Sequence, residues 1–309
     1  MLSVLVPTFN ERANILDCLQ SVSWADELVV VDSGSADGTR ELAHRCGARL
    51  VDFKWNGRFP KKKNWALENV TWSNEWLLIL DADERITPEL ANEIREVLKD
   101  PHADGYFINR RFLFMGKWIR HCGYYPSWNL RLFRHRQGRY ENLHPGDTGS
   151  GDIEVHEHLV LTGPKACLGH DMLHLAYPDI FTWMEKHNRY SNWEAEIQVR
   201  LRGTTRDDQS IGEPLLWKRR LRTWSRTMPF RPSLRFLYSY LLKCGFLDGY
   251  EGFVFCRLLA TYEMLSAFKA HELRCKSHSQ RGGRPRPRLM RSQGSLAERE
   301  AGTRRPRPG

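Results

Sequence analysis

Three apolar segments in the first hundred residues each end in a polar cluster that contains acidic side chains. The segments and the clusters that follow them are residues 2–6 with 8–11, 28–31 with 32–37, and 76–80 with 81–84. Helical patterns separate them, and a further apolar segment covers 48–53. Such alternation is typical of an α/β fold with a doubly wound, mainly parallel sheet. Ligands of these sheets bind beyond the carboxyl ends of the strands, so we expect the three clusters to converge on one crevice.

The distribution of residue types along the 309 residues predicts three regions. They are an α/β domain over 1–202 (with halves at 1–104 and 105–202), a helical region over 203–275, and a disordered Arg/Pro-rich tail over 276–309. The tail carries +8 of the formal net charge of +10, so the rest of the chain is nearly neutral. The basic character of the whole chain therefore says little about the crevice.

Several classes of protein are excluded by what the sequence lacks. The seven cysteines include no CxxC pair, which predicts free thiols in a reducing compartment rather than a disulfide scaffold or zinc module. The apolar run at the N-terminus is too short for a signal peptide, and no stretch of about 18 uncharged apolar residues predicts a membrane span. No GxGxxG follows the first strand, which argues against a dinucleotide oxidoreductase.

The sharpest local motif is Asp81-Ala82-Asp83, which directly follows the apolar run WLLIL. Two carboxylates at a strand end can hold Mg²⁺ or Mn²⁺ and leave coordination positions open for phosphate oxygens. The alternative is a pair of acids that suits the dipole of a following helix.

Four blocks in the order VLVPTFNE, VVVDSGSADGT, KKKNWAL and WLLILDADE resemble family 2 glycosyltransferases of the GT-A fold. Three later blocks, VHEHL, LHLAYPDIFTWMEKHNRYS and GFLDGYEGF, are similar to the branch that adds β-1,4-glucose to the lipopolysaccharide core. The resemblance covers roughly residues 1–270.

This resemblance implies an inverting transfer from a nucleotide-diphosphate sugar, with UDP-glucose as the expected donor and a divalent cation, Mg²⁺ or Mn²⁺, as cofactor. The implied acceptor is a lipid-linked or lipopolysaccharide-core glycan. Asp83 would bind the cation, with His174 as a further ligand; the alternative for His174 is a buried core histidine. The implied donor-binding residues are Pro7, Thr8, Asn10, Glu11, Asp32, Lys63, Asn64 and Asp81.

Within that set, Asp32 would contact the base or ribose, and Asp81 would lie near the sugar or ribose. Lys61, Lys62 and Lys63 could hold the diphosphate, but for any single one of them a solvated basic turn is the expected structure.

An inverting transfer needs one general base to deprotonate the acceptor hydroxyl. Glu157 matches the family's His-Glu block, and Asp152 and Glu154 are close substitutes. The alternative role for Glu157 is an ion pair with Arg131 or Arg134. On the helix expected over 178–201, the side chains of Lys186, Arg189 and Tyr190 could face phosphate or acceptor, or simply solvent.

Aromatic and basic residues alternate over 214–270, which predicts amphipathic helices on an anionic membrane surface. We therefore expect a peripheral protein on the cytoplasmic face of the inner membrane; the alternative is a helical subdomain packed on the α/β domain. The tail lacks a recognition module, so no specific nucleic-acid partner is expected. Two alternative functions are a non-catalytic membrane or nucleic-acid adaptor and a DxD phosphatase, although Arg85 stands where the phosphatase pattern has Thr or Val.

Overall fold

The chain begins with alternating strands and helices, as its sequence predicts. A computed structural model describes residues 1–141, 158–200 and 230–282. The first elements are β1 (Leu2–Thr8), α1 (Arg12–Ser21), β2 (Glu27–Asp32), α2 (Thr39–Arg45), β3 (Arg49–Asp52), α3 (Lys62–Asn69) and β4 (Trp76–Ile79). β1 pairs in parallel with β2 and β4, and β2 pairs in parallel with β3. The expected α/β class is confirmed, and the carboxyl ends of these strands share one edge of the sheet.

Strands from the second half extend this sheet in a mixed arrangement. The elements are β5 (Glu84–Ile86), α4 (Pro88–Val97), β6 (Gly105–Phe114), β7 (Lys117–Trp118), β8 (Trp128–Arg134), β9 (Gly138–Tyr140), β10 (Leu159–Leu161) and β11 (Lys165–Tyr177). The strand order is β3-β2-β1-β4-β8-β6-β11-β5, with β7 paired to β6, while β9 and β10 form a separate pair. β8 is antiparallel to both β4 and β6, so it carries side chains from the second half to the strand ends of the first.

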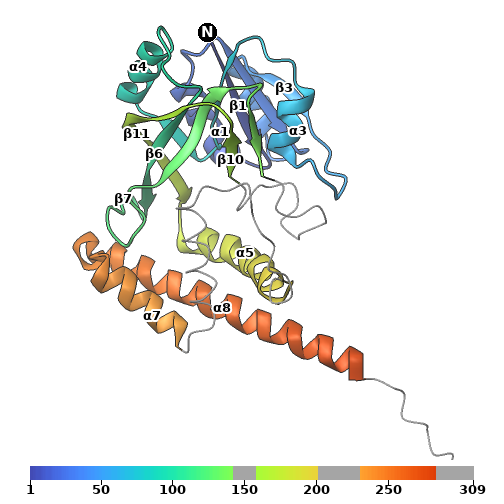
Figure 1. Cartoon of the computed structure of the whole chain (residues 1–309), viewed down its shortest axis with the longest axis vertical. Helices are drawn as coiled ribbons and strands as arrows, with labels where there is room; N and C mark the ends of the chain where they lie inside the picture. The colour runs from blue at the N-terminus through green and yellow to red at the C-terminus, as the bar shows by residue number, and fades with distance from the viewer. Residues whose placement is uncertain (142–157, 201–229, 283–309) are drawn as a thin grey trace, which may run out of the picture.

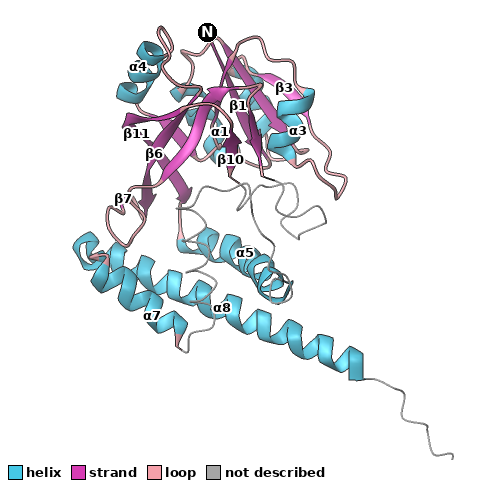
Figure 2. Cartoon of the chain, viewed as in Figure 1, coloured by secondary structure: helices cyan, strands magenta, loops and turns pink. Residues whose placement is uncertain are grey.

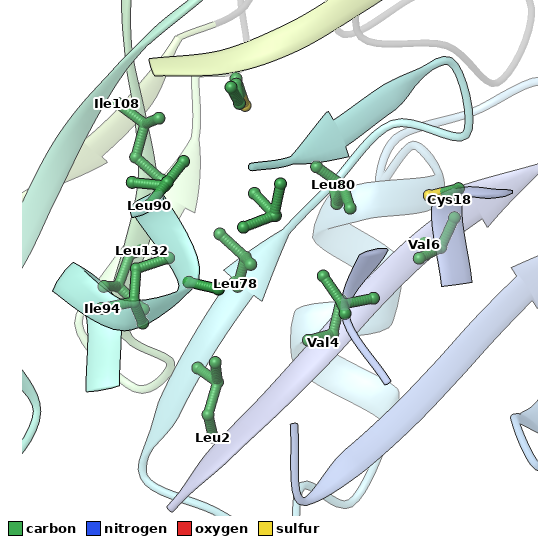
Figure 3. Close-up of a cluster of buried hydrophobic side chains, with 14 of the residues drawn as sticks. Leu2, Val4, Val6, Cys18, Leu78, Leu80, Leu90, Ile94, Ile108 and Leu132 are labelled. Atoms are coloured by element: carbon green, nitrogen blue, oxygen red, sulfur yellow. The ribbon is translucent and has the colours of Figure 1, made fainter. Parts of the chain in front are cut away.

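Both faces of the central strands are buried. Val4 and Val6 of β1 lie on one face with Leu78, against Leu90 of α4 (Figure 3). Leu5 lies on the opposite face, in a cluster that includes residues of α3. Alternate side chains of a strand point to opposite faces, so a strand covered on both sides has a continuous apolar sequence. This explains why the strands read as uninterrupted apolar runs.

Helices from the C-terminal part of the chain form a layer at one end of the sheet (Figures 1 and 2). They are α5 (Ile180–Arg200), α7 (Arg231–Leu237), the π-helical turn η2 (Tyr238–Leu242), the 3-10 turn η3 (Gly245–Asp248) and α8 (Gly249–Gly282). Phe255 of α8 packs against Phe112 and Phe114 of β6, with ring centroids 5.1 and 5.3 Å away. Further along α8, the Nζ of Lys269 donates a hydrogen bond to the carbonyl oxygen of Asn188 in α5 at 2.8 Å. The sheet, α5 and α8 are thus joined by direct contacts.

All seven cysteines are free thiols. Among the helices that the structure describes, none combines the length and the apolar character needed to cross a membrane.

Candidate functional site

The first two polar clusters interlock at the carboxyl ends of β1 and β2. The Oγ1 of Thr8 donates a hydrogen bond to Asp32 Oδ1 at 2.9 Å, and the backbone N–H of Asn10 donates to Ser35 Oγ at 2.8 Å. The backbone N–H of Glu11 donates to Thr39 Oγ1 at 2.9 Å. The structure therefore brings these clusters together, as the order of strands predicts.

Asp32 organises the loop after β2. Its carboxylate accepts hydrogen bonds from the backbone N–H groups of Gly34 and Ser35 at 2.9 and 2.8 Å. Burial alone would raise the pKa of Asp32, but the hydrogen bonds from Ser35 and Thr8 outweigh burial and hold the pKa below its ordinary value. Because both oxygens already accept protein hydrogen bonds, any contact from Asp32 to a nucleotide would have to share them.

The three lysines at the start of α3 are buried. Lys61, Lys62 and Lys63 expose only 4%, 5% and 8% of their surface, so the expectation of a solvated basic turn is wrong. The Nζ of Lys62 donates a hydrogen bond to the carbonyl oxygen of Thr8 at 2.8 Å, and the Nζ of Lys63 lies 2.8 Å from Asp81 Oδ1. The physical reason is that oxygen acceptors at the ends of β1 and β4 replace the water lost around the ammonium groups of Lys62 and Lys63.

Asn64 joins two elements through its side-chain amide. Its Nδ2 donates to the carbonyl oxygen of Tyr140 at 2.9 Å, and its Oδ1 accepts from the backbone N–H of Tyr140 at 2.8 Å. Asn64 is 1% exposed. The amide thus links α3 to β9.

Asp81 is one of four charged groups that form a network at the end of β4. The guanidinium of Arg131, on β8, lies 2.6 Å from Asp81 Oδ2 and 2.7 Å from Glu84 Oε1. Burial would raise the pKa of Asp81, but the positive charges of Arg131 and Lys63 lower it well below its ordinary value. Asp81 is therefore an anion with a cation on each oxygen.

Asp83 faces a different set of partners from Asp81. Its Oδ1 lies 3.6 Å from His174 Nε2, and its Oδ2 lies 3.7 Å from the Nζ of Lys186 on α5. The backbone N–H of Leu175 donates to the carbonyl oxygen of Asp83 at 2.8 Å, which fixes β11 against the turn. Burial lowers the pKa of His174, although the charge of Asp83 opposes this, so the imidazole is neutral near pH 7.

The same crevice contains Glu11 and Tyr190. Burial raises the pKa of Glu11, the hydrogen bond from Asn14 opposes this rise, and the charge of Asp83 adds to it. Burial also raises the pKa of Tyr190, and the charge of Asp83 contributes. The sequence left open whether the side chains of α5 face the substrates or solvent. Lys186 and Tyr190 lie toward the acidic clusters, whereas Arg189 is exposed to solvent.

The side chains of Asp83 and His174 are suitable ligands for a divalent cation. A neutral imidazole beside a carboxylate offers two ligands, and Mg²⁺ commonly takes its remaining ligands from substrate phosphates and water. Across residues 1–141, 158–200 and 230–282, no group of three or more His, Cys, Asp or Glu side chains could hold a metal by itself. A cation here would therefore depend on oxygens of the bound diphosphate.

Several residues named in the sequence analysis do not belong to the group around Asp83. Glu157, Asp152 and Glu154 lie outside the described residues, as does the region 201–229. Arg131, which the sequence offered as a partner for Glu157, pairs with Asp81 and Glu84. Pro7 occupies β1 opposite Val31.

Arg110 also belongs to the charged network and was not predicted, nor was the pairing of Arg131 with Glu84. The Arg110 guanidinium lies 3.4 Å from Glu84 Oε1. The signal for Arg131 is present in the sequence WNLRLFR, where a basic residue lies among the apolar residues Leu130, Leu132 and Phe133 of the strand. A charge in such a position needs a buried partner.

Residues 3–151 match the family model described as glycosyl transferase family 2. The chain is 28% identical over 289 residues to the lipopolysaccharide core biosynthesis glycosyltransferase LpsC of Rhizobium meliloti, covering 88% of this chain and 92% of that protein. It is 25% identical to an uncharacterized glycosyltransferase of Rickettsia typhi, covering 90% and 89% of the two chains. Among solved structures, a mannosyltransferase of Pyrobaculum calidifontis in complex with GDP-Man and Mn²⁺ is similar with a TM-score of 0.49 and 17% identity, covering 87% of this chain and 86% of that chain.

Proposed function

We propose that the chain is an inverting family 2 glycosyltransferase that transfers glucose from UDP-glucose to a lipopolysaccharide-core or other lipid-linked glycan. The observation that carries the donor part is the placement of Asp83, His174 and Lys186 around one point beyond β4. The similarity to LpsC over most of both chains supports the acceptor class. The two alternatives, an adaptor and a phosphatase, find no support in the family match.

The donor diphosphate would lie beside Asp83. Asp83 and His174 would hold Mg²⁺ or Mn²⁺, which neutralises charge on the departing nucleoside diphosphate. The Nζ of Lys186 donates to the carbonyl oxygen of Ala176 at 3.1 Å, which keeps its positive charge in the crevice. A fixed ammonium can stabilise the same leaving group without reorganisation during the reaction.

The network of Lys63, Asp81, Arg131 and Glu84 would give the pocket its shape. Its charges compensate one another, so Asp81 can accept a hydrogen bond from a sugar or ribose hydroxyl while remaining ionised. The general base stays a prediction: Glu157, with Asp152 and Glu154 as substitutes, would take the proton of the acceptor hydroxyl.

Calorimetric titration with UDP, GDP, ADP and dTDP, each with and without Mn²⁺, tests the donor site. We expect metal-dependent binding of UDP, and Asp83→Asn should weaken it by at least about tenfold because the cation loses its carboxylate ligand. Asp100→Asn, an exposed aspartate at the end of the segment after α4, is the matched control and should bind as the wild type does.

Unchanged metal-dependent binding in folded Asp83→Asn would contradict the metal assignment. Binding of a nucleotide other than UDP would replace the donor while leaving the rest of the proposal intact. If none of the four nucleotides binds with metal, the proposed donor site is wrong.

A further inference from the structure

Five apolar side chains of α7 and η2 face outward. They are Leu234, Leu237, Tyr238, Leu241 and Leu242. Their positions are i, i+3, i+4, i+7 and i+8, which places them on one side of a helix. Each exposes between 41% and 75% of its surface. An apolar stripe of this kind normally faces a core, so its outward orientation needs a physical explanation.

The opposite side of the same helix is anchored in the protein. The rings of Phe236 and Tyr240 stack with centroids 5.2 Å apart, and Phe236 contacts Phe253 of α8 at 5.9 Å. Because these aromatic residues fix the inner side, the outward stripe cannot turn inward without breaking this packing.

The apolar surface continues into the next two elements. Phe246 and Leu247 of η3 expose 48% and 59% of their surface, and Tyr250 at the start of α8 exposes 70%. These three residues and the five of the stripe are called the outward apolar face below. The face combines aliphatic side chains with aromatic ones, which settle at the boundary between lipid headgroups and acyl chains.

Positive charges surround the outward apolar face. Lys243, Lys117 and Arg120 are exposed around η3. Glu251 pairs with Lys117 at 3.2 Å, so these two charges offset each other, and the positive charge of the rim comes from Lys243 and Arg120. Asp248 is buried and accepts a hydrogen bond from the backbone N–H of His121 at 2.8 Å. A second copy of the chain would place this basic rim against another basic rim, which disfavours self-association. Anionic lipid headgroups, in contrast, are attracted by it.

We propose that the outward apolar face docks on an anionic phospholipid bilayer, with Lys243 and Arg120 contacting headgroups. The proposal goes beyond glycosyl transfer and does not depend on it. α5 carries Lys186 to Asp83 and is tied to α8 through Lys269 and Asn188, so the helical layer that bears this face lies on the crevice side of the sheet (Figure 1). Docking would therefore bring the crevice near a membrane-anchored acceptor.

Sedimentation of the full chain with phosphatidylcholine vesicles, with and without phosphatidylglycerol, tests the proposal. We expect binding to the anionic vesicles, and the double variant Leu241→Ser/Leu242→Ser should bind at least about tenfold more weakly because it removes two apolar side chains from the face. Phe268→Ser is the matched control: Phe268 is 64% exposed on α8, far along the helix from η3, and its loss should leave binding unchanged.

Thermal unfolding of each variant checks that the fold is retained. Equal binding of the wild type and the double variant would overturn the proposal, as would wild-type binding that ignores phosphatidylglycerol or does not occur. A concentration-dependent dimer that the double variant abolishes, without vesicle binding, would assign the face to self-association and also overturn it. Nucleotide titration of the same samples reports on the donor site separately.

Discussion

Individual charged side chains in this protein are buried in pairs whose members depend on each other. Arg131 is 5% exposed and contacts two carboxylates, those of Asp81 and Glu84. A charge removed from water is tolerated only when opposite charges and hydrogen bonds replace the lost hydration. Arg131 therefore contributes to the stability of the fold by compensating the negative charges of Asp81 and Glu84.

Removing Arg131 should destabilise the fold strongly. Arg131→Met keeps an unbranched side chain but leaves Asp81 and Glu84 without their guanidinium, and we expect the free energy of unfolding to fall by about 3–5 kcal/mol. Chemical denaturation followed by circular dichroism measures this change.

Arg139→Met on β9 is the matched control, because Arg139 is exposed and should change the free energy of unfolding by less than about 0.5 kcal/mol. Similar losses in the two variants would show that the buried network does not contribute as described.

At the scale of elements, single side chains fix how helices meet strands. Thr87 begins α4 by accepting a hydrogen bond from the backbone N–H of Leu90 at 3.2 Å, and Pro88 occupies the first turn, where its missing N–H needs no partner. The link between α3 and β9 through Asn64 has no such local sequence signal, because its partner is 76 residues away.

Asn64→Ala should loosen α3 from β9. The variant leaves the buried N–H and carbonyl groups of Tyr140 without their partner, so we expect a loss of about 1–3 kcal/mol in the free energy of unfolding. Hydrogen exchange of the Tyr140 amide should also become faster.

Asn69→Ala is a suitable control, since Asn69 only donates to the carbonyl oxygen of Trp65 within its own helix. If Asn64→Ala keeps the stability of the wild type but loses UDP binding, Asn64 is a donor contact and its link to Tyr140 is secondary.

At the scale of the whole molecule, acid should unfold the protein through its paired carboxylates. The pKa values of Asp32 and Asp81 are lower in the folded protein than the value of about 3.9 expected after unfolding. Below pH 4 the unfolded chain therefore takes up protons that the folded chain does not, and the stability present above pH 4 is lost as the pH falls toward the folded pKa values.

Asp32→Asn should reduce this pH dependence. Removal of one such carboxylate lowers the slope of unfolding free energy against pH by at most about 1.4 kcal/mol per pH unit below pH 4, while stability at pH 7 also falls. Denaturation between about pH 2 and pH 7 measures the slope. A variant that loses stability with acid as steeply as the wild type would contradict the assignment, and Asp100→Asn serves as the unaffected control.

Apolar runs and strand order in the sequence are enough to predict the parallel strands and the meeting of Thr8 with Asp32. Tertiary contacts are needed to explain why Lys61, Lys62 and Lys63 are buried, why Asp81 and Asp83 face different partners, and why Arg131 compensates two acids. Those outcomes depend on antiparallel β8 and on α5, which reach the crevice from 50 to more than 100 positions along the chain. Ion pairs between residues so far apart leave no periodic pattern in the sequence. They can therefore be identified only once the folded structure places the charges together.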